Sequence, residues 1–207
     1  MAGRGRPFYG GARDGSDAYA PLPGDRAQRR VEFRQVRDRP CLQDVLPGAW
    51  LTFGVDSLDA AMPAALREGD GGLDIGPDGS VGVGPEYRRL SDAWALGVAA
   101  MVRAGAHVVL DEVFLDGAGG QKRWMHALDG LDALWVGVRC DPDTAAGREA
   151  ARGDRVPGMA RAQAESVHLG VRYDMEVDSA AREPMACARL IAERYVQHVR
   201  GARGREA

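Results

Sequence analysis

Two short, almost wholly apolar segments constrain the fold of this chain more than any other feature. Residues 107–110 and 133–138 are too short for buried helices, and each lies shortly before an acidic residue. Strands that are apolar on both faces are typical of parallel sheets, which helices cover on each side. Parallel strands also need long crossover connections, usually helices, so the sequence predicts an α/β fold.

The segments around these two strands complete the same pattern. Further strands and long helices are predicted at residues 50–55, 173–178, 86–103 and 183–199. Apolar residues that alternate around Gly76-Pro77-Asp78-Gly79 predict a β-hairpin. We therefore expect a parallel sheet with flanking helices over residues 41–200, followed by a tail at 201–207.

Residues 1–40 differ in character from the rest of the chain. They contain nine arginines and many glycines and prolines, and they show neither helical nor strand periodicity. Such a segment cannot bury enough apolar surface to offset its ordering entropy. We therefore predict that residues 1–40 are disordered. No apolar region follows the early arginines, so a secretory signal is not expected.

Composition excludes several classes of function. The net charge is −3, which gives no basic field for nucleic acid, and no apolar run could span a bilayer. The three cysteines are scattered, without the spacing of a zinc site or of a disulfide framework. We expect a cytoplasmic protein that binds a small molecule, without nucleic-acid or membrane partners and without a direct metal-ligand cluster.

Acidic residues follow three predicted strands, where ligands bind in open parallel sheets. Asp56 is equally well interpreted as a catalytic carboxylate and, with Ser57, as the cap of a helix that continues to Leu66. Asp111 suits a magnesium-associated acid, although acidic residues at strand ends are common. Asp141, which precedes a proline, is better explained as a turn or cap.

Arginines cluster after the strand at 133–138. Arg148 and Arg152 are four residues apart on one predicted helix face, and Arg155 follows in the next loop. One interpretation is a solvated face paired with Glu149 and Asp154. The other is a mobile phosphotransferase lid, because several guanidinium groups can stabilise a phosphoryl group during transfer.

Five segments carry a family resemblance. They are L-Q-D-V-L-P-G-A-W-L-T-F-G-V-D-S-L at 42–58, G-P-E-Y-R at 84–88, V-L-D-E-V-F-L at 109–115, L-W-V-G-V-R-C-D at 134–141 and G-R-E-A-A-R-G-D-R-V-P-G-M-A at 147–160. On these segments the chain resembles the chloramphenicol phosphotransferase family of P-loop kinases. The resemblance covers residues 41 to about 199.

The resemblance implies an enzyme that uses ATP and Mg²⁺ to phosphorylate a primary hydroxyl of an antibiotic such as chloramphenicol, and so confers antibiotic resistance. It implies that Asp56 is the base that takes the hydroxyl proton, with Ser57 close to the substrate. It assigns the lid arginines to Arg152 and Arg155, with Arg148 nearby.

The phosphate loop of such a kinase is absent from the sequence. The motif G-x-x-x-x-G-K-[ST] should precede Cys41, but the only lysine is Lys122. One permitted set of codons for residues 27–40, read from its second base, gives L-N-G-A-S-S-S-G-K-S-G-I-A and continues into Cys41 if a base is restored near Pro40. We therefore hypothesise that a frameshift has altered the amino-terminal region. The central first strand and the phosphate loop would then be missing or degraded, and the chain as written impaired.

Two alternatives remain open on the sequence. The chain could be another P-loop kinase that acts on a different hydroxyl or on a nucleotide. It could also be a non-catalytic remnant or interaction protein whose arginine-rich amino-terminal segment binds a partner.

Overall fold

The computed structural model describes residues 30–33, 39–67, 71–76, 80–152 and 158–203. Its centre is a five-stranded parallel sheet in the order β2-β5-β1-β6-β7. The strands are β1 (Arg30–Phe33), β2 (Trp50–Gly54), β5 (His107–Asp111), β6 (Asp132–Arg139) and β7 (Met175–Asp178). The predicted α/β class is confirmed, and the two apolar segments form β5 and β6 near the middle of the sheet.

The central strand corrects the sequence prediction. Residues 30–33 are not disordered, and the central first strand is not missing: β1 lies between β5 and β6, with Val31 opposite Val108 and Ala133. Parallel pairing uses backbone groups, and both neighbouring strands present backbone N–H and C=O groups that need partners. A four-residue strand is too short to show a reliable period. The phosphate loop was sought within residues 27–40, and residues 34–38 of that segment lie outside the described part of the chain.

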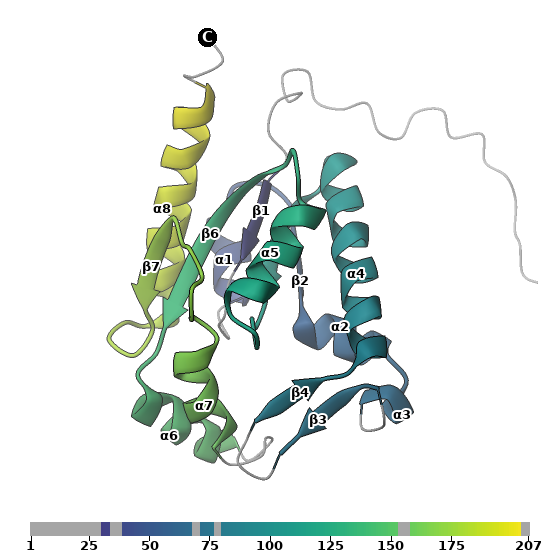
Figure 1. Ribbon diagram of the computed structural model, residues 1–207. Coiled ribbons are helices and arrows are strands. Elements are labelled where there is room, and N and C mark those ends of the chain that lie inside the picture. Colours follow the sequence, from purple (N-terminus) through teal and green to yellow (C-terminus); the bar gives the residue numbers. More distant parts are fainter. Residues whose placement is uncertain (1–29, 34–38, 68–70, 77–79, 153–157, 204–207) are drawn as a thin grey trace, which may run out of the picture.

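Helices cover both faces of the sheet (Figure 1). Helices α4 (Pro85–Arg103) and α5 (Ala118–Ala127) cover one face, where a core forms around the fully buried Val108 and Leu110. Helices α1 (Arg39–Val45) and α8 (Pro184–Arg203) cover the other face, where Val109 is fully buried against them. The alternation of buried side chains along β5 thus explains why it is apolar throughout.

A smaller unit lies beside the carboxyl ends of the strands. It consists of α2 (Val55–Ala61), α3 (Ala64–Arg67) and the hairpin of β3 (Leu73–Ile75) and β4 (Val81–Val83), as Figure 1 shows. The predicted hairpin is confirmed. The single helix expected after Asp56 is divided, because Pro63 disfavours helical backbone at Met62, where α2 ends. Leu58 and Met62 pack with Tyr87 of α4 in a third core.

Helices α6 (Pro142–Arg152) and α7 (Met159–Ser166) follow β6 at the same end of the sheet (Figure 1). The chain that returns from α7 is fastened to α5. Gln121 accepts from the Arg172 backbone N–H at 2.9 Å and donates to its carbonyl at 2.6 Å. Gly117, at φ 54°, lies so close to Leu169 that a Cβ would approach its carbonyl oxygen to 2.3 Å. Only glycine fits this contact.

The long helices belong to this globular arrangement. Both α4 and α8 carry charged residues along their length. Among the described helices, none has an apolar stretch sufficient for a membrane span.

His168 gives the fold a pH-dependent contribution. It is buried, its Nδ1 lies 2.6 Å from the Tyr173 hydroxyl, and burial, aided by the charge of Arg139, lowers its pKa to about 4. The unfolded chain, with a pKa near 6.5, therefore binds more protons between pH 4 and 6.5. The free energy of unfolding should fall in this window as the pH falls.

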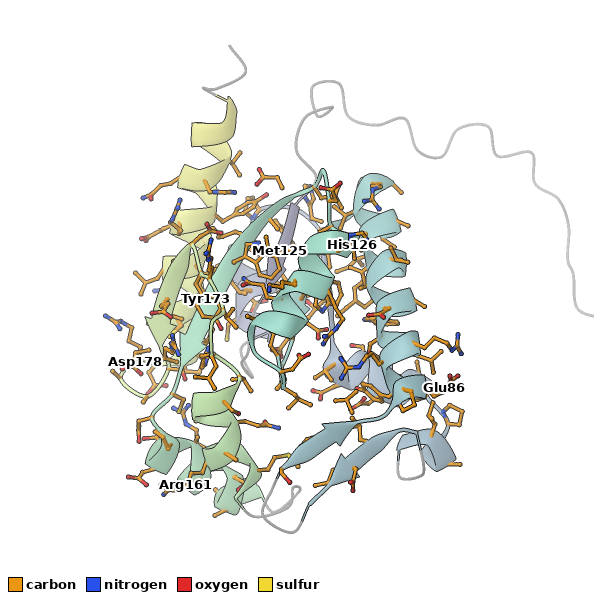
Figure 2. The ribbon with its side chains drawn as sticks, viewed as in Figure 1. Glu86, Met125, His126, Arg161, Tyr173 and Asp178 are labelled. Atoms are coloured by element: carbon orange, nitrogen blue, oxygen red, sulfur yellow. The ribbon has the colours of Figure 1, made fainter. Side chains whose placement is uncertain are left out.

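We predict that His168→Gln flattens this pH dependence. The wild type should lose free energy of unfolding on the order of 2 kcal/mol between pH 6.5 and 4 through His168, and the variant should not. Urea unfolding at several pH values measures it. The matched control is His126→Gln, because His126 is exposed on α5, away from Tyr173 (Figure 2). Equal slopes for wild type and His168→Gln would contradict the assignment.

Candidate active site

A cavity of about 180 Å³ lies between α4 and the segment that connects β5 to α5. Val81 and Val83 of β4 contribute one wall, and Tyr87 and Trp94 of α4 contribute another. Glu112, which directly follows β5, lines the cavity as well. We call this space the Tyr87 cavity. It lies at the carboxyl edge of the parallel sheet, where ligands bind in such folds.

Asp56 lies in the first turn of α2, immediately after β2. Asp56 is not the N-cap residue of α2, because that position is occupied by Gly54. The Asp56 side chain is exposed. Its neighbour Val55 lines the Tyr87 cavity, while Ser57 is half-buried beside it and is not among the described lining residues.

Tyr87 connects Asp56 to the cavity. Its hydroxyl donates a 2.5 Å hydrogen bond to Asp59 Oδ1. Burial and this hydrogen bond raise the pKa of Tyr87 far above its usual range, and the charges of Asp59, Glu112 and Asp56 raise it further. Three carboxylates therefore act electrostatically on one buried hydroxyl in the cavity wall. Glu112 lines the cavity, whereas Asp56 is not among its described lining residues.

A network of ion pairs forms the opposite part of the wall. Arg123 donates two hydrogen bonds to Asp116, with NH1 2.7 Å from Oδ2 and NH2 3.0 Å from Oδ1. Arg88 NH1 lies 3.6 Å from the same Oδ2, and Arg123 Nε lies 3.9 Å from Asp92 Oδ1. The Arg123 hydrogen bonds lower the pKa of Asp116 below its usual range. All four side chains line the Tyr87 cavity.

Sequence reasoning did not identify Tyr87 or the four residues of this network. They come from α4, from α5 and from the segment just before α5, and no short motif contains them together. A weak signal was present, because Arg88 and Asp92 are charged residues four apart in α4 and therefore lie on one face of that helix. Their relation to Asp116 and Arg123 depends on how α4 and α5 pack.

Asp111 is the last residue of β5, opposite Gly54 of β2 in the sheet register. Its half-buried side chain lies at the strand end expected for a magnesium-associated acid. Within the described ranges, no group of three or more acidic, histidine or cysteine side chains could hold a metal by itself. Magnesium often uses only one or two carboxylates together with substrate phosphates, and the site fits the ion on those terms.

The three predicted lid arginines differ in what the structure describes. Arg148 NH2 donates to the backbone carbonyl of Ser179 at 2.7 Å, so this guanidinium is anchored to the loop after β7. Arg152 is the last residue of α6, and its side chain lies outside the described part. Arg155 lies within 153–157, also outside it. The structure therefore places Arg148 beside Ser179, and the lid assignment of the other two stays a prediction.

The acidic residues near these arginines have structural roles. Asp141 accepts hydrogen bonds from the backbone N–H groups of Asp143 and Thr144, at 3.1 and 2.9 Å, which confirms that it caps α6. Glu149 is buried and accepts from the N–H groups of Gly158 and Ala160, both at 2.8 Å. Glu149 thus caps α7 from within α6.

We predict that Glu149→Ala lowers the free energy of unfolding by about 1 to 3 kcal/mol, because two backbone donors of α7 lose their buried acceptor. Urea unfolding measures the change. Glu193→Ala, at an exposed position of α8, is the matched control and should change stability by less than about 0.5 kcal/mol. An unfolding curve for Glu149→Ala that overlays the wild type would contradict this account.

Comparison with known proteins supports a kinase-like interpretation of this geometry. Residues 39–196 match the family model described as chloramphenicol phosphotransferase-like protein. Two sequences of Mycobacterium tuberculosis, from strains H37Rv and CDC 1551, are 27% identical over 177 residues, which covers 74% of this chain and 73% of theirs. Both are described only provisionally as O-phosphotransferases.

Two solved structures share the fold. A tunicamycin resistance protein of Deinococcus radiodurans has a TM-score of 0.54 at 17% identity, covering 80% of this chain and 93% of that one. A sugar kinase from Janibacter sp. HTCC2649 has a TM-score of 0.53 at 12% identity, covering 84% and 95%. At these identities, the similarity shows that the two structures share the fold of this chain, and nothing about its activity.

Proposed function

Because the chain belongs to the chloramphenicol phosphotransferase-like family, whose fold is that of P-loop kinases, we propose that its site transfers a phosphoryl group from ATP to a hydroxyl of a small molecule. The acceptor would bind in the Tyr87 cavity. The observation that carries this proposal is the position of Asp56, two residues after the end of β2 and next to Val55, which lines the cavity.

In this proposal Asp56 is the general base. Its carboxylate would accept the proton of the acceptor hydroxyl while that oxygen forms a bond to the γ-phosphorus. The bond from the γ-phosphorus to its bridging oxygen breaks, and ADP leaves.

ATP and magnesium enter this proposal through the other strand ends. Asp111 would hold Mg²⁺ together with phosphate oxygens, and the ion would neutralise charge on those phosphates. Arg152 and Arg155 would approach the transferred group from the segment after α6, and Arg148 would hold that segment through Ser179. The preferred acceptor is a primary hydroxyl of an antibiotic such as chloramphenicol.

The phosphate loop decides whether the chain as written is active. Its sequence has no G-x-x-x-x-G-K-[ST] motif, so it lacks the lysine and the loop N–H groups that hold the phosphates. Loss of such contacts costs several kcal/mol of transition-state stabilisation. We therefore propose that a frame-restored protein, in which L-N-G-A-S-S-S-G-K-S-G-I-A replaces residues 27–40, is the competent form.

We predict that the frame-restored protein binds a fluorescent ATP analogue with Mg²⁺ at least about 100-fold more tightly than the chain as written. Fluorescence titration measures both proteins. The control is the restored protein with its loop lysine changed to alanine, which should lose most of the gain. Similar affinity in all three proteins would rule out the proposed loop, and sequencing the gene across codons 25–45 tests the frameshift directly.

We predict that Asp56→Ala in the frame-restored protein lowers kcat for phosphorylation of chloramphenicol by about 10² to 10⁴-fold, because the hydroxyl loses its base. Production of ADP and of the phosphorylated antibiotic measures this. Asp129→Ala is the matched control, since that residue is exposed in the turn after α5. Turnover in Asp56→Ala equal to the control would remove Asp56 as the base.

A panel of other alcohols and nucleotides distinguishes the alternative kinase. Activity on a nucleotide with none on chloramphenicol would favour another acceptor for the same machinery. Absence of transfer to every acceptor, with a partner that protects residues 1–40 from protease, would favour the interaction protein.

A further inference from the structure

We propose that the Tyr87 cavity selects acceptors without negative charge, and that Asp116 is the residue that sets this selectivity. The favoured ligand is an alcohol on an aromatic body that is neutral or carries an ammonium group. This inference rests on the proposed function in taking the cavity as the acceptor site. It goes further by excluding nucleotides and sugar phosphates as acceptors.

The described charges around the cavity are unequal. Two guanidinium groups line it, those of Arg88 and Arg123, against three carboxylates, those of Asp92, Glu112 and Asp116. Asp56 and Asp59 act on the same site through Tyr87. An anionic ligand would therefore meet carboxylates on several sides, and like charges brought together oppose binding.

Both guanidinium groups are already engaged. Asp116 takes the two-pronged hydrogen bond of Arg123 and also lies 3.6 Å from Arg88, so one carboxylate holds both cations. Asp92 adds a second contact to Arg123, at 3.9 Å. A carboxylate or phosphate on a ligand would have to displace Asp116, because Arg binds carboxylates and phosphates through this same pair of parallel hydrogen bonds.

The uncharged part of the wall indicates the rest of the ligand. Tyr87, Trp94, Phe114 and Trp124 all line the cavity, so its surface suits a flat apolar group. About 180 Å³ accommodates a single aromatic ring, since a dry cavity of roughly 150 Å³ binds benzene.

The test uses three probes of one shape that differ only in charge. They are 1,4-benzenedimethanol, which is neutral, 4-(aminomethyl)benzyl alcohol, which is cationic, and 4-(hydroxymethyl)benzoate, which is anionic. NMR titration of the full-length chain at low ionic strength gives the three dissociation constants. We expect the wild type to bind the benzoate roughly tenfold more weakly than the other two.

Asp116→Asn removes the charge that holds both arginines. We expect the benzoate to become the tightest of the three probes and the ammonium probe to weaken, a reversal that a general loss of packing would not produce. Salt at 0.5 M should shrink the differences, because these side chains are partly exposed. Asp129→Asn, a matched removal of charge outside the cavity, should keep the wild-type order.

A second variant keeps the test decisive if Asp116→Asn does not fold. Arg123→Gln leaves the carboxylates and removes one cation, so the benzoate should bind still more weakly than to the wild type. Equal binding of the benzoate and the neutral probe by the wild type, an unchanged order in Asp116→Asn, or no shift with any probe would overturn the inference. The wild type could bind the three probes in the expected order while the frame-restored protein transfers no phosphoryl group. That result would support the charge selectivity of the cavity and reject only the proposed function.

Discussion

The site depends on the parallel pairing of β2 with β5. The register places Gly54 opposite Asp111, so the residues that follow each strand emerge at the same edge of the sheet. Asp56 follows one strand and Glu112 the other, and the charges of both contribute to raising the pKa of Tyr87. Backbone hydrogen bonds fix this edge, and a one-residue slip would turn the side chains of β5 from one face of the sheet to the other. The carboxylates are thus positioned by the most buried part of the molecule, where Val108, Val109 and Leu110 are fully buried.

Tyr87 connects the helix that follows β2 to the wall of the cavity. Tyr87 belongs to α4 and packs against Leu58 of α2 and against Met62, which directly follows α2. Its hydroxyl donates a hydrogen bond to Asp59 of α2. The hairpin adds Val81 and Val83 to the cavity that Tyr87 lines. The unit formed by α2, α3 and the hairpin therefore serves as one wall of a site whose other wall comes from β5 and α5. A kinase fold can change its acceptor by altering such a wall while keeping the sheet unchanged.

The sequence predicted elements well where burial dictates composition. Strands β5 and β6 were evident as apolar segments, and the hairpin was evident from its turn residues. The central strand β1 was missed because four residues in an arginine-rich segment carry little pattern, and its place between two buried strands is a tertiary effect. Asp56 was predicted as a catalytic carboxylate from its position after a strand, and this role stays a prediction. Asp116 and Arg123 were not identified, because their partners Arg88 and Asp92 belong to another helix and only packing brings the four together.

Helix α5 joins the two halves of the proposed site. Arg123 of this helix and Asp116 just before it form the ion-pair wall of the cavity. On the same helix, Gln121 holds the Arg172 backbone and Ala118 donates to the Leu169 carbonyl at 2.9 Å, which fixes the chain that returns from α7. Gly117 permits that close contact, since any side chain there would collide with Leu169. The acceptor wall and the return from the arginine-bearing helices therefore share one rigid support, so a substitution that displaces α5 would disturb both together.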